Sequence, residues 1–199
     1  ALIDFVIGVS YGGIAGMASR RVDTIMMRVA EVVYSIPYML IVILMSVTFS
    51  NQQGVSLMTM VLAMTITGWV PMAILVRGQV LQLKENDYVM ASRSMGGKDL
   101  FILKNHIIPN TLGPILVNVT LTIPRAIFAE ATLSFMSLGL QPPTPSLGVL
   151  VSEGLNSLGS TLNLEYQLII PAIVISLIMF SFNVLGDGMR DALDPRLRK

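Results

Sequence analysis

The chain has 199 residues, of which 53% are hydrophobic and only 13% are charged, and its mean hydropathy is +0.72. Soluble domains carry about 25% charged residues, so this composition excludes an ordinary soluble protein and indicates one embedded in a membrane. The chain has no cysteine, which excludes disulfides and thiol chemistry, and its single histidine cannot build a histidine metal site alone. The formal net charge of +1 gives no reason to expect nucleic-acid binding.

The first apolar stretch, residues 2–19, is rich in glycine. As a helix it would be about 27 Å long, slightly short of a hydrocarbon core of about 30 Å. It also begins without a start methionine, so we expect the chain to start part-way along a helix and to lack its N-terminal sequence. Small residues allow a neighbouring helix to approach closely, and here they are Gly8, Gly12, Gly13 and Gly16.

Four further stretches are apolar enough to cross a membrane, and they cover residues 29–49, 57–76, 111–128 and 166–185. Residues 36–49 are too few to cross alone, so the second helix is expected to begin before Pro37. Prolines inside the other stretches are tolerated when neighbouring helices satisfy the freed backbone groups. With five visible spans, the sequence predicts an all-α polytopic transmembrane helical bundle, a single domain over residues 1–199.

A polar loop at residues 84–110 interrupts this apolar pattern and is expected to form two short amphipathic helices. Asn86 is placed to cap the first helix, and Gly96 to end it in the left-handed conformation. Asp99 would start the second helix and Pro109 would limit it. The expected apolar faces are Tyr88, Ala91 and Met95 on the first helix, and Leu100, Leu103 and Ile107 on the second. Such a loop presents a compact docking surface beside a membrane.

The fourth apolar stretch carries one polar stripe. Thr111, Asn118, Thr122 and Arg125 recur at offsets that place them on one face of a helix. Because unpaired polar groups avoid lipid, the stripe should face either a water-filled translocation pathway or the hydrogen-bonding groups of a neighbouring helix. Both interpretations are open, and the four residues are candidates for the pathway.

The segment at residues 131–165 combines several prolines with apolar residues at helical spacing. We expect a short helix there that either lies at the outer membrane surface or re-enters the protein. Two ionisable residues precede it, Arg125 and Glu130, and their long side chains are expected to reach the membrane surface.

The basic residues indicate how the chain is oriented. All Lys and Arg except Arg125 follow the first span, follow the third span or end the chain. By the positive-inside rule, that side is cytoplasmic. Residues 84–110 and the C-terminus are therefore expected in the cytoplasm, and residues 50–56 and 131–165 outside.

Several motifs, spread over essentially the whole chain, resemble the permeases of binding-protein-dependent ABC importers. Ala91, Gly96 and Pro109 have the spacing of the "EAA" loop of that family. Resemblance to its dipeptide/oligopeptide/nickel branch comes from residues 106–110, 130–135 and 185–197. The loop departs from the family pattern at three positions, which are Met90, Ser92 and His106.

This resemblance implies a fold, a coupling site and partners. The fold would be that of type I ABC importer permeases, with one more helix before the first span. In the family, the loop matching residues 84–110 holds the coupling helix, which docks into the ATP-hydrolysing subunit. The residues implied in coupling are Tyr88, Ala91, Ser92, Met95, Gly96 and Pro109. The partners implied are a homologous permease, two subunits that bind ATP and Mg, an extracytoplasmic solute-binding protein, and the lipid bilayer of a bacterial or archaeal cytoplasmic membrane.

No catalytic motif is visible in the chain. The Gly-Gly-Lys-Asp sequence at residues 96–99 lacks the spacing and the hydroxyl residue of a phosphate-binding loop. We therefore expect a non-catalytic subunit without cofactor or metal, with ATP hydrolysis on other chains. His106 is expected to orient the loop rather than to bind a ligand. Glu31 lies within an expected helix, where a carboxylate is a functional candidate, but Arg28 three residues earlier favours a structural pair or a contact at the membrane surface.

The function implied is one permease half of an ATP-driven importer of di- or oligopeptides. A nickel chelate, glutathione or another small solute is the alternative within the same branch. A different class is an ion-coupled secondary transporter, which usually shows internal repeats and ionisable residues at the membrane midplane. A third is a purely structural membrane subunit. Co-purifying ATPase chains with substrate-stimulated ATP hydrolysis would separate the importer from both.

Overall fold

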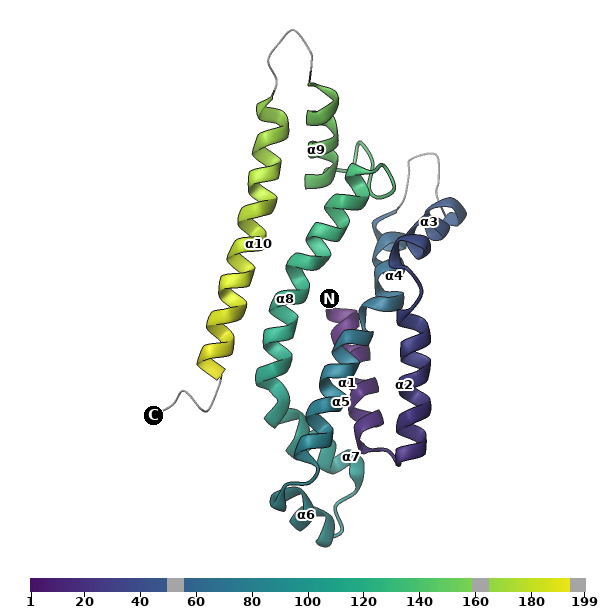
Figure 1. Ribbon diagram of the computed structural model, residues 1–199, viewed down its shortest axis with the longest axis vertical. Helices are drawn as coiled ribbons and strands as arrows, with labels where there is room; N and C mark the ends of the chain where they lie inside the picture. Colours follow the sequence, from purple (N-terminus) through teal and green to yellow (C-terminus); the bar gives the residue numbers. More distant parts are fainter. Residues whose placement is uncertain (50–55, 159–164, 194–199) are drawn as a thin grey trace. The chain divides into compact units, whose positions relative to one another are not determined.

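The computed structural model describes residues 1–49, 56–158 and 165–193, and every regular element in these ranges is a helix (Figure 1). The elements are α1 (Leu2–Met17), α2 (Arg20–Tyr34), α3 (Tyr38–Phe49), α4 (Leu57–Gly68), α5 (Val70–Leu83), α6 (Asp87–Ser94), α7 (Asp99–Ile102), the π-helix η1 (Leu103–Ile107), α8 (Ile108–Phe135), α9 (Leu147–Asn156) and α10 (Tyr166–Leu193). The expected all-α fold is confirmed. Nearly all of the loop expected at residues 50–56, and the end of the C-terminal tail, lie outside the described residues.

Among the residues that the structure describes, three helical stretches are long and apolar enough to cross a membrane, namely Leu57–Leu83, Asp99–Phe135 and Tyr166–Leu193. They contain the third, fourth and fifth expected spans. α1 has 16 residues and is shorter than a span, as the sequence indicated for this stretch. α2 and α3 meet the length and composition test only when they are taken together as one broken span.

The second expected span differs from the structure at Pro37. We expected one helix over residues 29–49, but α2 begins at Arg20 and ends at Tyr34, and α3 begins at Tyr38. Proline has no N–H to donate, and its ring disfavours helical backbone at the preceding residue, here Ile36. The local effect of the proline therefore breaks the helix that the length argument extended across it.

Pro109 does not limit the second helix of the polar loop, contrary to our prediction. Instead α7 continues through the wider π turn of η1 directly into α8, in which Pro109 is the second residue. A proline in the first turn of an α-helix removes an N–H that has little need of a partner there. Because η1 joins α7 to α8 without a gap, the helical stretch continues past Pro109. The fourth span therefore starts well before residue 111.

Contacts divide the chain into two compact units. Unit 1 comprises Ala1–Ile36, Thr65–Val119 and Asp187–Lys199, and unit 2 comprises Pro37–Met64 and Thr120–Gly186. The polar loop and the helices that support it all belong to unit 1. Unit 2 contains α3, most of α4, the second half of α8, α9 and most of α10.

Glycines on one face of α1 allow its backbone to lie directly against α5 in unit 1. A Cβ atom added at Gly12 would stand 2.2 Å from the carbonyl oxygen of Ala73, and one at Gly16 would stand 2.6 Å from the Cβ of Val80. Gly8 meets Met72 in the same way at 2.6 Å. The close approach that these small residues were expected to permit is confirmed.

The same unit has an apolar core that reaches from α5 into the polar loop. Its fully buried members come from α5, α6, α7, η1 and α8, and they include Val76, Val80, Val89, Ile102, Ile107 and Ile115. The packing of apolar side chains thus anchors the loop on the long helices.

Unit 2 has a second core around Val42 of α3, Met60 of α4 and Leu133 of α8. After α8, the hydroxyl of Ser146 accepts the N–H of Val149 at 3.1 Å and so caps α9. This confirms a short helix within residues 131–165. α9 packs closely on α8, because a Cβ at Gly148 would lie 2.2 Å from the carbonyl oxygen of Ala131.

Candidate functional site

The helix α6 begins where the sequence predicted it. Asn86 occupies the N-cap position with extended backbone (φ −73°, ψ 147°), and Asp87 lies in the first turn. The side chain of Asn86 makes no capping hydrogen bond. Its carbonyl accepts the N–H of Val89 at 3.0 Å and that of Met90 at 3.1 Å, so the backbone alone defines this end.

The other end of α6 is closed by glycine. Gly96 has φ +87°, which confirms the expected left-handed stop. The N–H of Gly97 donates to the carbonyl of Ser92 at 2.9 Å, and that of Gly96 donates to the carbonyl of Arg93 at 3.0 Å. This pair of bonds is the Schellman motif, which satisfies carbonyls that a helix end would otherwise leave free.

An ion pair closes the turn between α6 and α7. Arg93 donates to Asp99 at 2.9 Å, and α7 begins at that aspartate. Both side chains are exposed, so the pair contributes at most about 1 kcal/mol. Its value lies in fixing the direction of the chain after Gly96 and Gly97.

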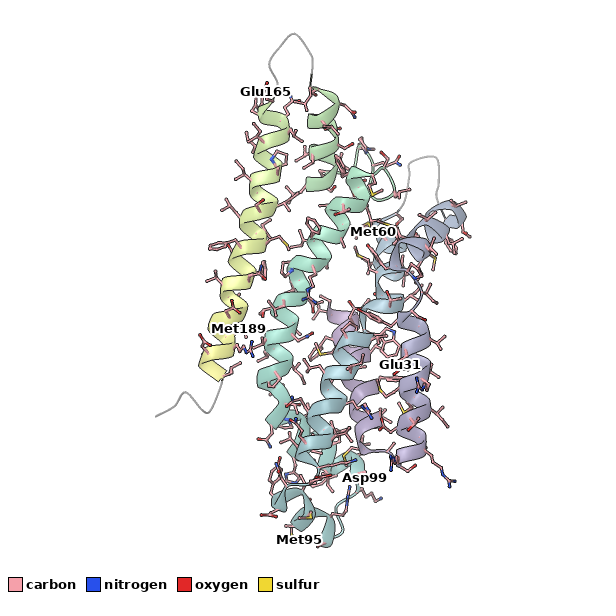
Figure 2. The ribbon with its side chains drawn as sticks, in the orientation of Figure 1. Glu31, Met60, Met95, Asp99, Glu165 and Met189 are labelled. Atoms are coloured by element: carbon pink, nitrogen blue, oxygen red, sulfur yellow. The ribbon has the colours of Figure 1, made fainter. Side chains whose placement is uncertain are left out.

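α6 has one supporting face and one free face. Val89 and Ser92 are buried against the rest of unit 1. Tyr88, Met90 and Met95 are 41%, 51% and 83% exposed, and Figure 2 shows Met95 at the end of unit 1 that the loop forms. The apolar face expected to dock, with Ala91 also exposed, is therefore uncovered in this chain, whereas Ser92 belongs to the supporting face.

His106 connects α6 with the π turn. Its ring meets Tyr88 edge-on with centroids 6.4 Å apart, and it meets Phe101 at 5.8 Å. The amide of Asn110 donates to the carbonyl of His106 at 2.6 Å. These contacts agree with an orienting role for the histidine. Within the described ranges, no three His, Asp or Glu side chains are grouped so that they could hold a metal ion.

Sequence reasoning missed a groove of about 520 Å³ beside α6. It is lined by residues from the end of α1, the end of α5 and the polar loop, including Met17, Ser19, Lys84, Glu85, Met90 and Arg93. A smaller apolar hollow of about 250 Å³ adjoins it and is lined in part by Ile14, Leu100 and Leu103. The lining residues at the end of α1 and those of the polar loop lie roughly 70 positions apart in sequence. A periodic pattern links only residues of one helix or strand, so it could not reveal this groove.

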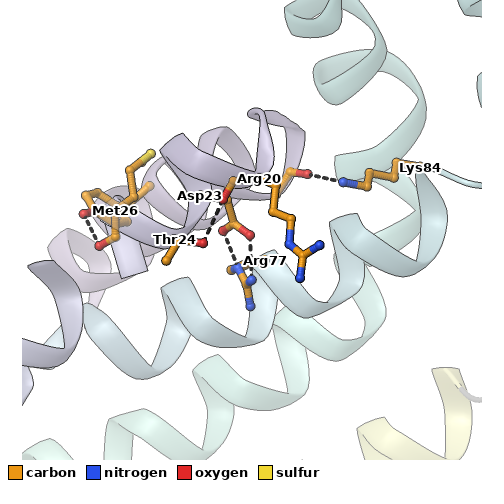
Figure 3. A network of polar contacts seen from close by, with 8 residues as sticks. Arg20, Asp23, Thr24, Met26, Arg77 and Lys84 are labelled. Atoms are coloured by element: carbon orange, nitrogen blue, oxygen red, sulfur yellow. Dashed lines mark hydrogen bonds and ion pairs between the residues drawn. The ribbon is translucent and has the colours of Figure 1, made fainter. Parts of the chain in front are cut away.

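Sequence reasoning also missed a polar network at the base of the loop, drawn in Figure 3. The carboxylate of Asp23 in α2 accepts two bonds from the Arg77 guanidinium of α5, at 2.5 and 2.6 Å. Directly after α5, the Lys84 ammonium donates to the carbonyl of Gly16 at 3.1 Å. The chain segments leading into α6 are thereby tied to both α1 and α2.

The polar stripe of α8 does not have one environment. Thr111 is completely buried, and its hydroxyl donates to the carbonyl of Ile108 in the same helix at 2.9 Å. Asn118 and Thr122 are half-buried, and Arg125 is exposed. Thr111 and Asn118 belong to unit 1, whereas Thr122 and Arg125 belong to unit 2.

Two ionisable residues weighed at the start have local partners. Glu31 accepts a bond from Arg28 at 2.8 Å on the exposed side of α2, which confirms the pairing. Glu130 accepts the hydroxyl of Ser134 at 2.7 Å, and that hydroxyl in turn accepts the N–H of Leu140 at 3.0 Å. Glu130 therefore helps to shape the turn that follows α8.

Comparison with known proteins finds one matching family and several related permeases. The family described as "Binding-protein-dependent transport system inner membrane component" matches residues 8–199. The dipeptide transport system permease protein DppC of Bacillus subtilis (strain 168) is 52% identical over 199 residues, which are 100% of this chain and 60% of the relative. The oligopeptide transport system permease protein OppC of the same organism is 49% identical over 199 residues, covering 100% of this chain and 63% of the relative.

A third relative, the dipeptide transport system permease protein DppC of Lactococcus lactis subsp. cremoris (strain MG1363), is 42% identical over 196 residues, covering 98% of this chain and 55% of the relative. The chain thus spans between 55% and 63% of the length of these three relatives. The family match, in contrast, extends over almost the entire chain. The chain belongs to the family of binding-protein-dependent transport system inner membrane components.

Proposed function

We propose that this chain is the permease subunit of an ATP-driven importer of di- or oligopeptides and forms half of the translocation pathway. The observation that carries the proposal is α6, a core-anchored helix with an uncovered apolar face of Tyr88, Ala91 and Met95. The relatives named for dipeptide and oligopeptide transport support the substrate class. The complete transporter would contain a homologous permease, two ATP-binding subunits and an extracytoplasmic solute-binding protein.

In this proposal α6 docks into a cleft of an ATP-binding subunit on the cytoplasmic side. ATP hydrolysis takes place on that partner, and closure of the two ATP-binding subunits displaces α6. Val89 is buried in the same core as Val80 of α5 and Ile107 of η1. Because close-packed interiors transmit strain, α6 carries the displacement into the long helices, and rigid helix motions then alternate access to the pathway.

The pathway itself is the second part of the proposal. Asn118 and Thr122 provide half-buried polar groups in a largely apolar part of α8. Several weak polar contacts suit a route that must also release its solute. Thr111 is completely buried and bonded within its own helix, so it serves packing instead, and the route is proposed to start at Asn118.

The proposal can be tested by purifying this chain together with a candidate homologous permease, ATP-binding subunits and binding protein. ATP hydrolysis is then measured with and without the binding protein loaded with trialanine. We expect the ATP-binding subunits to co-purify and the loaded binding protein to stimulate hydrolysis. Failure of the ATP-binding subunits to associate would refute the proposal.

Two tryptophan variants locate the docking surface. Ala91→Trp places a large side chain in the middle of the exposed face of α6 and should abolish stimulation while the chain remains in the membrane. Gln82→Trp is the control, because Gln82 is an exposed position on α5 outside that face. Equal behaviour of the two variants would show that α6 is not the docking element.

A further inference from the structure

Two helices of unit 1 are joined by an ion pair that fixes orientation as well as distance. Nε and Nη2 of Arg77 donate to the two oxygens of Asp23, at 2.5 and 2.6 Å. The side chains are 31% and 10% exposed, respectively. A guanidinium and a carboxylate that meet through two parallel bonds allow little rotation or sliding. The pair therefore sets the register of α2 along α5.

α2 has few other attachments to the unit. The hydroxyl of Tyr11 donates to the carbonyl of Met26 at 2.7 Å, and a small apolar cluster surrounds Met27 and Ala30. The opposite side of α2 exposes apolar side chains, namely Val22, Ile25, Val29 and Val32. Between α2 and α5, the ion pair is the directional contact that the structure describes, and it opposes a slide of α2 by one residue, about 1.5 Å.

The position of the pair along both helices is informative. Arg77 lies six residues before the end of α5, roughly 9 Å from the start of the loop that carries α6. From Asp23, α2 runs on to Tyr34 and the break at Pro37, where unit 1 ends and unit 2 begins. The pair therefore joins the helix that precedes α6 in the chain to the helix that leads into unit 2.

Stability alone is a poor explanation for such a pair. Desolvating two charges costs free energy that their attraction only partly returns, and well-packed apolar residues often stabilise a protein as well or better. α1 and α5 illustrate the alternative, because glycine packing brings their backbones together, and the charged contact described there is a single bond from Lys84 to a backbone carbonyl. An ion pair in this place provides directional attachment instead.

We propose that Asp23 and Arg77 act as a coupling strut, which makes α2 follow α5 when α6 is displaced. The idea rests on the proposed function, since it assumes that α6 receives the displacement. Both are positioning residues, because neither contacts nucleotide or solute. Breaking the pair should let α6 and α5 move while α2 lags behind, so that ATP is hydrolysed without matching uptake.

The first test measures uptake per ATP in proteoliposomes that contain the complete transporter, with radiolabelled trialanine as the probe. For Asp23→Asn and for Arg77→Gln, we expect this ratio to fall at least about fivefold, the lower end of typical coupling between sites. The double variant with Asp23→Arg and Arg77→Asp should recover a large part of the ratio. Arg28→Gln is the matched control, since it breaks the exposed pair with Glu31 on the same helix.

The second test does not need a transported solute. The chain has no cysteine, so two spin labels can be attached to the same chain, one at Ile25→Cys on α2 and one at Gln82→Cys on α5, both of which are exposed positions. With the Asp23–Arg77 ion pair intact, the two labels should give one narrow distance distribution, both with and without ATP. Asp23→Asn should broaden it or make it depend on nucleotide.

The outcomes separate the strut from mere stabilisation and from the proposed function. A stabilising role would lower the amount of folded chain in both charge variants while the uptake per ATP of the surviving molecules stayed normal, and this result would overturn the strut. An unchanged spin-label distribution in Asp23→Asn would also overturn it. If the wild type hydrolyses ATP without trialanine uptake, the proposed substrate fails, and the spin-label distances still decide whether α2 follows α5.

Discussion

Replacing Gly12 by alanine should separate α1 from α5. The new Cβ atom would lie 2.2 Å from the carbonyl oxygen of Ala73, and 3.0 Å from the Cα and carbonyl carbon of that residue. Carbon–oxygen contacts across helix interfaces are about 3.3–3.6 Å, so the backbones must part by roughly 1 Å. Overpacking of this kind costs about 1–3 kcal/mol. The upper end applies, because the atoms in the way are backbone, and alanine returns about 1 kcal/mol through its helix propensity. The net loss should be about 2 kcal/mol.

The chain provides its own probe for this change. Trp69 is the single tryptophan, and its ring lies 4.7 Å from that of Tyr11 on α1, so its fluorescence reports on the contact between α1 and the start of α5. Unfolding of the purified chain in mixed micelles of rising SDS content should show the loss for Gly12→Ala. Gly78→Ala is the control, because among the described residues nothing beyond its own turn of helix lies within 4 Å of its added Cβ, and it should be neutral or slightly stabilising. Equal stability of the two variants would refute the close-packing argument.

Three further predictions follow from the polar loop and the pathway. Gly96→Val should lower the stability of the chain by about 1 kcal/mol or more, because φ is +87° at this position. It should also reduce the stimulated ATP hydrolysis, and normal stimulation would contradict the coupling role of α6. Met95→Cys should resist an impermeant thiol reagent added to intact cells, whereas Thr144→Cys should react with it. The reverse labelling would show that the expected membrane topology is wrong. Asn118→Cys should react with small aqueous thiol reagents at a rate that changes with ATP, whereas Thr111→Cys should stay inert. An inert Asn118→Cys in every state would favour the packing interpretation of the stripe.

The parts of the polar loop that were predictable depend on residues close together in sequence. An N-cap position at Asn86 and a left-handed stop at Gly96 follow from the chemistry of one or two residues. The helical spacing within residues 131–165 likewise revealed α9. Such features need no knowledge of what packs against the chain, so they can be read from the sequence.

The features that were missed depend on distant residues or on an uncommon backbone form. Asp23 and Arg77 pair across 54 residues, and no periodic pattern links them. The passage of Pro109 into α8 requires the π turn of η1, which has no recognisable sequence signature. At Pro37 two signals oppose each other: the proline favours a break, and the length of a membrane span favours one continuous helix. The structure follows the proline, since α2 ends at Tyr34 and α3 begins at Tyr38.

A backbone carbonyl in the last turn of α1 accepts a hydrogen bond from a side chain at the end of α5. α1 has no basic side chain of its own in that turn, and the Lys84 ammonium reaches the carbonyl of Gly16 instead. A cation at a helix C-terminus contributes about 0.3–1 kcal/mol. Fraying at the end of α1 is therefore linked to the placement of Lys84, two residues before the N-cap of α6. Any displacement of the loop that withdraws this lysine would loosen a helix end roughly seventy residues earlier in the chain.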